Sequence, residues 1–231
     1  MTEHVYSLTP SVRTSGLGKR FGHKWALSHV DLEIDAGEGL LVVGDNGSGK
    51  STLLRLLAGL LLPTLGTVQI FGSSPQKPGS GARRHLALVG HQGYLYEALT
   101  PFETLAFWNR LQGGRRSSAD LEALLAEAGL AADRDTRVSG FSAGMRKRLS
   151  IARLHLETPR VALLDEPFSA LDSAGRHWLL DTLAKLRAEG TTLVIASHDP
   201  QRAVPLCNRA IRIEHGQIAW QGSPSEAGPV S

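Results

Sequence analysis

The sequence predicts an α/β fold with three parts: a core built on a mostly parallel sheet, an N-terminal antiparallel β layer and an inserted helical subdomain. The parallel sheet is predicted because continuous apolar runs, bounded by glycines, alternate with helical patterns. The antiparallel layer is predicted because residues 12–71 contain further strand-like runs with turn residues between them. The helical subdomain is predicted because residues 97–157 are mainly helical in pattern.

Each element follows from its local pattern. The runs expected to form buried parallel strands are residues 39–43, 86–89, 161–164 and 192–196. The strands expected in the antiparallel layer are residues 12–17, 26–34 and 67–71, with a turn at residues 35–37. The helices are expected at about residues 50–59, 104–111, 119–128, 143–157 and 173–189.

These elements suit a single domain of 231 residues that carries a subdomain. Residues 1–92 and 158–222 are expected to form the core with its antiparallel layer. Residues from about 93 to 157 are expected to form the helical subdomain, with an exposed loop at residues 113–118. The segment 223–231 is rich in Gly, Pro and Ser and is expected to be a frayed tail.

The composition is that of an ordinary globular protein, with 42% hydrophobic and 20% charged residues. The formal net charge of +3 gives no strong basic field, so nucleic acid is not an expected partner. The single cysteine, Cys207, cannot form an internal disulfide, which is consistent with a reducing compartment.

Neither a leader nor a membrane span is expected. The first ten residues lack the pattern of a signal peptide. The leucine-rich stretch 53–62 includes Arg55 and is too short to cross a bilayer. If the protein serves a membrane process, a separate chain is expected to supply the membrane part.

A phosphate-binding loop is predicted at residues 44–51, which match the pattern G-x-x-x-x-G-K-[ST] between a strand and a helix. The glycines allow backbone N–H groups to converge on phosphate oxygens, and the helix N-terminus adds a positive dipole. Lys50 is expected to reach the β and γ phosphates, and Ser51 to ligate Mg²⁺. The alternative without a nucleotide-binding role is a flexible Gly-Ser loop with a solvated lysine. The residues predicted to bind a nucleoside triphosphate here are Gly44, Asn46, Gly47, Ser48, Gly49, Lys50, Ser51 and Thr52.

An acidic pair follows the apolar run 161–164. Asp165 is expected to hold Mg²⁺, and Glu166 to polarise the water that attacks the γ-phosphate. Strands often end in a solvated carboxylate, so the pair is weak evidence alone. Paired with the phosphate loop it becomes strong.

Further motifs make the chain resemble the ATP-binding subunits of ABC transporters. Residues 165–172 are similar to the extended Walker B motif and D-loop of this family, and residues 141–153 to its signature sequence. His198 matches the switch histidine of the family, and Gln92 the glutamine that meets both Mg²⁺ and the transmembrane partner. Phe21 sits where the family places an aromatic ring against adenine. The motifs run in the family's order from about residue 12 to residue 215.

The resemblance implies a P-loop NTPase core of RecA-like type that binds and hydrolyses ATP with Mg²⁺. It implies Glu166, His198 and Lys50 as catalytic residues, and Ser51, Gln92 and Asp165 as metal ligands. The alternative for His198 is a structural role, as a residue next to a helix cap. Trp25 lies four residues after Phe21, and either ring could instead be core packing.

The resemblance also implies that two ATPase subunits act together, as a homodimer closed around ATP. Ser142 and Gly144 begin a predicted helix and would touch the γ-phosphate bound by the opposite subunit. Asp172 would lie across the same interface. The chain departs from the usual Leu-Ser-Gly-Gly-Gln at Phe141, Ala143 and Met145. The loss of the glutamine amide at Met145 leaves open how the helix start is oriented.

Integral membrane transporter subunits are the other partner implied, which would place the chain at the cytoplasmic face of the cell membrane. Aromatic side chains follow Gln92, and in the family the adjacent groove receives a helix of the membrane subunit. Simple filling of the helical core is the alternative for each of them. The candidates for this groove are Tyr94, Leu95, Tyr96, Phe102 and Trp108.

Within the family, the sequence around Gln92 and the Ser-Ala-Gly signature are similar to those of the haem-exporter ATPases of cytochrome c biogenesis. A general multidrug or lipid exporter ATPase is the alternative within transport. An ABC ATPase outside transport, acting as a nucleotide-driven dimerisation switch, is the alternative of another class. The presence of Glu166 and His198 favours an enzyme over a protein that only binds nucleotide.

Overall fold

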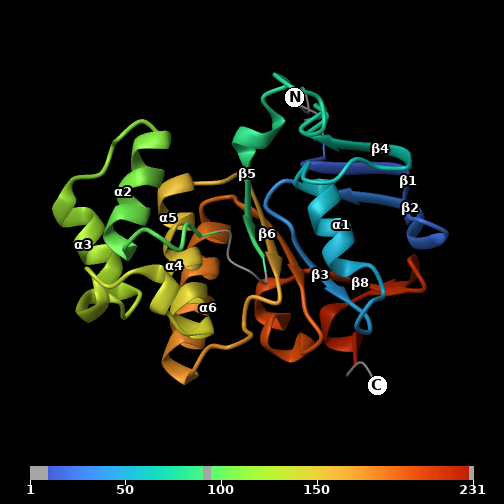
Figure 1. Cartoon of the computed structure of the whole chain (residues 1–231). Helices are drawn as coiled ribbons and strands as arrows, with labels where there is room; N and C mark the ends of the chain where they lie inside the picture. The colour runs from blue at the N-terminus through green and yellow to red at the C-terminus, as the bar shows by residue number, and fades with distance from the viewer. Residues whose placement is uncertain (1–9, 91–94, 229–231) are drawn as a thin grey trace, which may run out of the picture.

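Two β-sheets and a layer of helices make up the structure (Figure 1). The computed structural model describes residues 10–90 and 95–228. The first sheet has three strands in the order β2 (Lys24–Ile34), β1 (Val12–Phe21) and β4 (Leu65–Ile70). The second has six strands in the order β5 (Leu86–Val89), β6 (Val161–Asp165), β7 (Thr192–Ala196), β3 (Gly39–Val43), β8 (Arg209–Glu214) and β9 (Gln217–Gly222). The α-helices are α1 (Lys50–Leu57), α2 (Pro101–Leu111), α3 (Ser118–Glu127), α4 (Ala143–Ala152), α5 (Leu154–Glu157) and α6 (Ser173–Ala188).

The predicted fold class is confirmed. Strands β5, β6, β7, β3 and β8 pair in parallel, and only the edge strand β9 is antiparallel to its neighbour in this sheet. Every residue of β3, β6 and β7 is buried. Strands that are covered on both faces read as continuous apolar runs, which is why these three were visible in the sequence. In the other sheet β1 pairs antiparallel with both β2 and β4.

The two faces of the six-stranded sheet belong to two different parts of the core. Leu40 and Val42 of β3 face α1, which packs between this sheet and the antiparallel one. Leu41 and Val43 face the opposite way, toward α6. Successive side chains of a strand point to opposite faces, so one short strand joins both halves of the core.

The helices α2 to α5 form a layer beside strands β5 and β6 (Figure 1). This layer has its own buried cluster, which includes Leu105, Leu125 and Leu149. Thr100 and Ser117 begin α2 and α3 with capping boxes, because each side chain accepts a hydrogen bond from a backbone N–H three residues later. Residues 113–118 are exposed, as expected for the loop between these helices.

The structure differs from the predicted elements in three places. The helix predicted at residues 143–157 divides at Arg153 into α4 and α5. Strand β8 was not predicted, because its sequence RAIRIE mixes arginines with apolar residues and so contains no continuous apolar run. Strand β9 was not predicted either, since it lies at a sheet edge and none of its residues is buried.

The expectation of a frayed tail is wrong for residues 223–228. Ser223 and Glu226 form a capping box around the short 3₁₀ turn Pro224–Glu226. Ala227 is fully buried, and its carbonyl accepts a hydrogen bond from the Arg212 guanidinium at 2.6 Å. A tail rich in Gly, Pro and Ser is held here by contacts that its composition does not reveal. Within the described part of the chain, no helix is both long and apolar enough to span a membrane.

Candidate active site

The candidate active site lies where several parallel strands end. The carboxyl ends of parallel strands meet at one edge of a sheet, and ligands of such folds bind in the crevice outside that edge. Here β3 leads into Gly44, β6 ends at Asp165, and β7 is followed by Ser197 and His198. A pocket of about 380 Å³ opens at this edge. It is lined by Ala26, Asn46, Gly47, Gly49, Lys50, Ser51, Thr52, Asp165, Glu166, Ser169 and His198.

The predicted phosphate loop forms one wall of this pocket, and its glycines are required by geometry. Gly44, Gly47 and Gly49 have φ angles of 147°, 82° and 120°, which residues with a side chain rarely adopt. A Cβ at Gly49 would lie 2.5 Å from the carbonyl oxygen of Ala26. The loop therefore lies directly against β2, and α1 begins at its end with free N–H groups.

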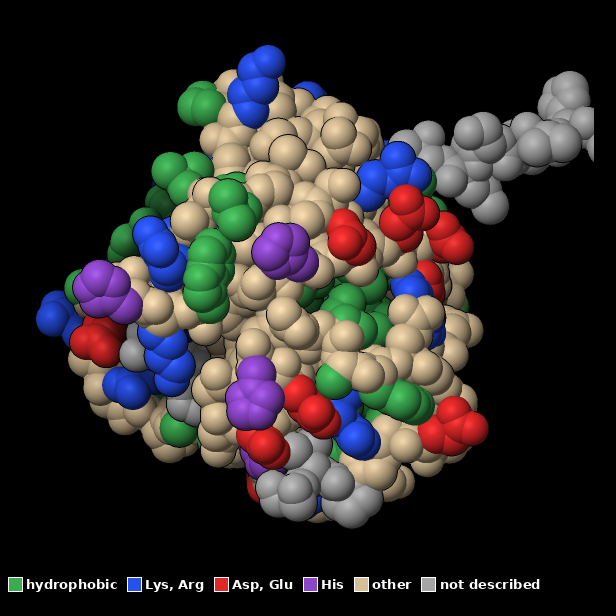
Figure 2. Space-filling view, turned by 90° about the vertical axis from the view of Figure 1, so that its right-hand side faces the viewer, with side chains coloured by type: hydrophobic (Ala, Val, Ile, Leu, Met, Phe, Trp, Pro, Cys, Tyr) green, Lys and Arg blue, Asp and Glu red, His purple; other side chains and the backbone are tan. Residues whose placement is uncertain are grey.

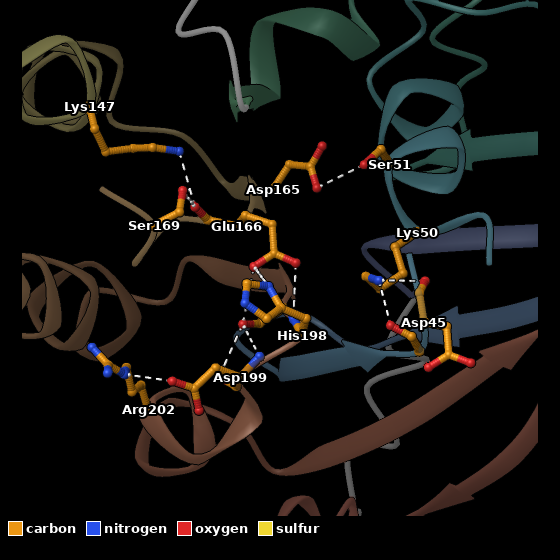
Figure 3. A network of polar contacts seen from close by, with 12 residues as sticks. Asp45, Lys50, Ser51, Lys147, Asp165, Glu166, Ser169, His198, Asp199 and Arg202 are labelled. Carbon is orange, nitrogen blue, oxygen red and sulfur yellow. Dashed lines mark hydrogen bonds and ion pairs between the residues drawn. The ribbon is translucent and has the colours of Figure 1, made fainter. Parts of the chain in front are cut away.

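Lys50 is the first residue of α1 and has only 6% of its surface exposed. Its ammonium donates hydrogen bonds to the carbonyls of Gly44 at 2.5 Å and Asp45 at 3.0 Å (Figure 3). Burial lowers the pKa of Lys50, whereas the negative charges of Glu166, Asp165 and Asp45 oppose this shift. A cation is thereby held at the mouth of the loop, with acidic side chains facing it.

Ser51 and Asp165 meet across the pocket. The Ser51 hydroxyl donates a hydrogen bond to Oδ1 of Asp165 at 3.0 Å (Figure 3). Both side chains offer oxygen atoms, which are the ligands that Mg²⁺ prefers. The donor set therefore fits Mg²⁺ between the loop and the end of β6. Gln92, the third predicted metal ligand, lies outside the described residues.

Glu166 and His198 face each other at the ends of β6 and β7. The backbone N–H of His198 donates to Oε1 of Glu166 at 2.9 Å, and Nδ1 of the ring lies 2.8 Å from Oε2 (Figure 3). The Glu166 side chain is 18% exposed and the His198 ring 61% exposed. The carboxylate is thus oriented by its neighbour and borders the pocket that also contains Lys50.

Two serines also belong to this site, although the sequence analysis did not predict them. Ser169 lines the pocket, and its hydroxyl donates to the carbonyl of Glu166 at 2.7 Å. The hydroxyl of Ser197 lies 3.4 Å from Oε2 of Glu166. Serines are common at strand ends and in loops, so the residue type alone did not indicate a role. The signal that could have identified them is position: Ser169 lies three residues after Glu166, and Ser197 directly precedes His198.

The signature residues lie apart from this pocket. Ser142 is the N-cap of α4, and its Oγ accepts a hydrogen bond from the N–H of Met145 at 3.2 Å. Ser142 is exposed, and neither it nor Gly144 lines the pocket of the same chain. A Cβ at Gly144 would lie 2.7 Å from the carbonyl oxygen of Ala170, so this close approach requires glycine. The helix start is therefore available to another molecule. Met145 stands in place of the usual glutamine, and its side chain packs against the core of the helical layer.

Asp172 also lies outside the pocket, as the N-cap of α6. Its Oδ1 accepts hydrogen bonds from the N–H of Gly175 at 2.8 Å and from the Arg148 guanidinium at 2.5 Å. These hydrogen bonds lower the pKa of Asp172. Because Arg148 is a residue of α4, this pair links the helix that Ser142 begins to the start of α6.

The two aromatic candidates for adenine lie at the tip of the β1–β2 hairpin. Phe21 is 51% exposed, and the Lys19 ammonium lies 5.3 Å from the centre of its ring. Two hollows border the phosphate loop, the pocket described above and a second one, and Phe21 lines neither of them. Trp25 lines the second hollow, of about 410 Å³, which reaches Asp45 and Ser48. Figure 2 shows the side of the molecule that carries the antiparallel sheet. On this side, exposed hydrophobic side chains lie next to Lys and Arg side chains. The role of Phe21 stays a prediction; of these two rings, that of Trp25 is the one that lines a hollow beside the phosphate loop.

The predicted aromatic groove is divided by the structure. Leu95, Phe102 and Trp108 pack against the core of the helical layer, whereas Tyr96 is 56% exposed. The ring of Tyr96 makes an edge contact with Phe107, at 5.5 Å between ring centres. Phe107 and Leu111 are also exposed and were missed, although their spacing of four residues indicated one face of α2. Tyr94 lies outside the described residues.

The comparisons with known proteins agree with this geometry. The family described as "ABC transporter" matches residues 27–169. The chain is 35% identical to the daunorubicin/doxorubicin resistance ATP-binding protein DrrA of Streptomyces peucetius, over 94% of this chain and 67% of that protein. It is 39% identical to the cytochrome c biogenesis ATP-binding export protein CcmA of Rhodopseudomonas palustris, over 82% of this chain and 93% of that protein.

A solved structure gives the same fold. The dimeric structure of a post-hydrolysis state of the ATP-binding cassette MJ0796, bound to ADP and Pi, is 28% identical in sequence. It superposes with a TM-score of 0.83 over 92% of this chain and 98% of that chain. Several curated relatives are longer: the chain spans 64% of the sulfate/thiosulfate import ATP-binding protein CysA of Rhodopseudomonas palustris.

Proposed function

Because this chain belongs to the ABC transporter family and carries its ATP-hydrolysing domain, we propose that its pocket binds ATP together with Mg²⁺ and that a second such domain completes each site. The observation that carries the proposal is the convergence of Lys50, the Ser51–Asp165 pair and the Glu166–His198 pair on one pocket. Three chemical needs of phosphoryl transfer are met there: a cation for the phosphates, oxygen ligands for a metal and a carboxylate for water.

In the proposed mechanism the loop N–H groups and the Lys50 ammonium bind the β and γ phosphates. Ser51 and Asp165 would hold Mg²⁺, which would neutralise negative charge of the phosphates when bound. The Glu166 carboxylate accepts a hydrogen bond from the attacking water and orients it toward the γ-phosphorus. His198 keeps that carboxylate in place through the backbone N–H and ring contacts described above.

The second half of each site is proposed to come from another copy. Ser142 and Gly144 stand at an exposed helix N-terminus outside their own chain's pocket, and a positive helix end suits a γ-phosphate. An isologous pair of copies would bring Ser142 of one chain to Lys50 of the other, twice over. Asp172 would lie near the same interface.

Substituting Ser142 by arginine tests this arrangement. The bulky side chain should block closure of two copies, so we expect ATP hydrolysis to fall by about 10²-fold or more. ATP affinity of the single chain should stay within about twofold, since Ser142 does not line its own pocket. Phosphate release and equilibrium nucleotide binding measure the two effects.

Ser118→Arg is the matched control, because Ser118 is an exposed serine of the same helical layer at the start of α3. It should keep both ATP binding and hydrolysis. Hydrolysis by Ser142→Arg at the rate of this control would mean that the signature end of α4 takes no part in the site.

We propose that the ATPase drives a transporter through integral membrane subunits at the cytoplasmic face of the membrane, with haem export for cytochrome c biogenesis as the specific task. Support for haem export comes from the signature sequence and from the similarity to CcmA, which extends over 93% of that protein. A general multidrug or lipid exporter is the alternative, supported by the similarity to DrrA. The exposed side chains of Tyr96, Phe107 and Leu111 are proposed to contact the membrane subunit.

Co-purification from membranes in mild detergent tests the transport proposal. We expect membrane subunits to be retained by the native chain and lost with Tyr96→Asp, which places a charge on the exposed patch without touching the ATP pocket. Haem should stimulate ATP hydrolysis by the purified complex if haem is the substrate. Stimulation by an anthracycline and not by haem would instead favour the drug exporter.

A further inference from the structure

Lys147 is a buried lysine in the second turn of α4, with 5% of its surface exposed. Its ammonium donates hydrogen bonds to the carbonyl of Glu166 at 3.1 Å and to the carbonyl of Gly90 at 3.4 Å. Figure 3 shows the side chain reaching from α4 toward Glu166. Burial lowers the pKa of Lys147, whereas Asp165 and Glu166 oppose the shift. A buried cation is costly for stability, so its contacts point to a role beyond packing.

The residue that Lys147 holds has an unusual backbone. Glu166 has a φ angle of 48°, in the left-handed region that residues with a side chain seldom adopt. Its N–H donates to the carbonyl of Ala196 at 2.9 Å, and its own carbonyl accepts from both Lys147 and Ser169. Such a conformation persists only where the surroundings hold it from several sides, and here they do.

This backbone turn sets the direction of the carboxylate. Once the Glu166 N–H and carbonyl are held, the side chain leaves the strand toward the N–H of His198 and toward the pocket. A shift of the carbonyl would rotate the peptide and displace the carboxylate from that position. Displacements of about 1 Å in a catalytic group are enough to lower rates by about 10²-fold.

We propose that Lys147 is a positioning residue for ATP hydrolysis. Its ammonium donates to the carbonyls of Glu166 and Gly90 and thereby holds the Glu166 carboxylate in the orientation that hydrolysis needs. The proposal rests on the proposed role of Glu166. Lys147 stands on the same helix that Ser142 begins, five residues further along. One helix therefore carries both the end proposed to meet a second copy and the lysine that contacts the Glu166 carbonyl.

Lys147→Met tests the proposal, because methionine has a similar length and no donor. In the full chain we expect kcat for ATP to fall by about tenfold to a hundredfold, while KM and the equilibrium affinity for ATP remain within about twofold. Lys147→Arg keeps a cation and donors and should recover part of kcat. Arg83→Met is the matched control: Arg83 also donates to two backbone carbonyls, those of Pro75 and Gly59, far from this pocket.

Ser169→Ala gives an independent test, since it removes a second side-chain donor to the same carbonyl and leaves the backbone N–H of Ser169, which also donates to it at 3.3 Å. In a double-mutant cycle the combined effect of Lys147→Met and Ser169→Ala on kcat should differ from the product of the two single effects, because both side chains donate to one carbonyl. A lysine that only stabilised the fold would lower the melting temperature and leave the kcat of the folded enzyme unchanged. Such a result, or a kcat equal to that of Arg83→Met, would overturn the proposal.

Two further outcomes are separable. If Lys147→Met does not fold, Ser169→Ala decides, and an unchanged kcat there overturns the proposal. Glu166→Gln, measured in parallel, isolates the premise: hydrolysis at the native rate by this variant removes the proposed role of Glu166 itself. Inactive Glu166→Gln together with fully active Lys147→Met removes only the role of Lys147.

Discussion

Lys50→Ala is expected to abolish ATP hydrolysis, with a loss of at least about 10²-fold. The ammonium is the cation at the mouth of the phosphate loop, and alanine offers neither charge nor donor to the β and γ phosphates. ATP binding should weaken as well, because the phosphate charge is then balanced only by N–H groups and the metal. Phosphate release and calorimetric titration with Mg-ATP measure the two losses.

The thermal stability of the same variant separates a binding defect from a folding defect. Burial lowers the pKa of Lys50, so its charge is partly desolvated in the folded state and its removal relieves that cost. We therefore expect the melting temperature without nucleotide to be unchanged or higher. ATP at about 100 times its Kd stabilises a native protein by about 2.7 kcal/mol, and this shift should disappear. Lys185→Ala, at an exposed position of α6, is the control and should keep the stabilisation by ATP. If ATP raised the melting temperature of Lys50→Ala as much as that of the native chain, the phosphate-loop assignment would be wrong.

Glu166→Gln is expected to bind ATP and fail to hydrolyse it. An amide has the size of the carboxylate but does not accept a proton, so the loss in rate should be of order 10²–10⁴-fold. The backbone N–H of His198 can still donate to the amide oxygen, so the local structure should survive. Since ATP persists in the proposed shared site, two copies should stay together.

Size-exclusion chromatography with Mg-ATP measures this trapping as a doubling of mass. The native chain should return to its original elution volume as ATP is consumed, and Glu166→Gln should not. Glu189→Gln is the control, because Glu189 is an exposed carboxylate at the C-terminal end of α6 and lines neither hollow beside the phosphate loop. An elution volume of Glu166→Gln that stays monomeric with saturating ATP would contradict the shared site.

The phosphate loop illustrates how far local sequence reaches. Its glycines, Lys50 and Ser51 act within a few residues of one another, and the strand before and the helix after them are visible as an apolar run and a helical pattern. The N-cap at Ser142 was predictable for the same reason, because a cap is a contact over three residues. Buried strands were equally visible, since both faces are covered and the apolar run is continuous.

Contacts between distant segments were beyond such patterns. Lys147 reads as one of several basic residues on a helix, and only the packing of α4 against β5 and β6 turns it inward to Gly90 and Glu166. Phe107 and Trp108 are adjacent in sequence, yet one is exposed and the other packs against the helical core. The tail at residues 223–228 was misjudged because its order depends on Arg212, which is distant in sequence.

The sequence by itself thus determined the local features of the candidate site: a glycine-rich loop that ends in Lys50 and Ser51, an acidic pair at the end of a buried strand, and a serine-capped helix, all encoded by short-range spacing. Tertiary structure alone decided which side chains meet at the sheet edge and which face outward. The physical reason is that backbone hydrogen bonding and capping act over three or four residues, whereas burial and side-chain orientation depend on segments that come together only when the chain has folded.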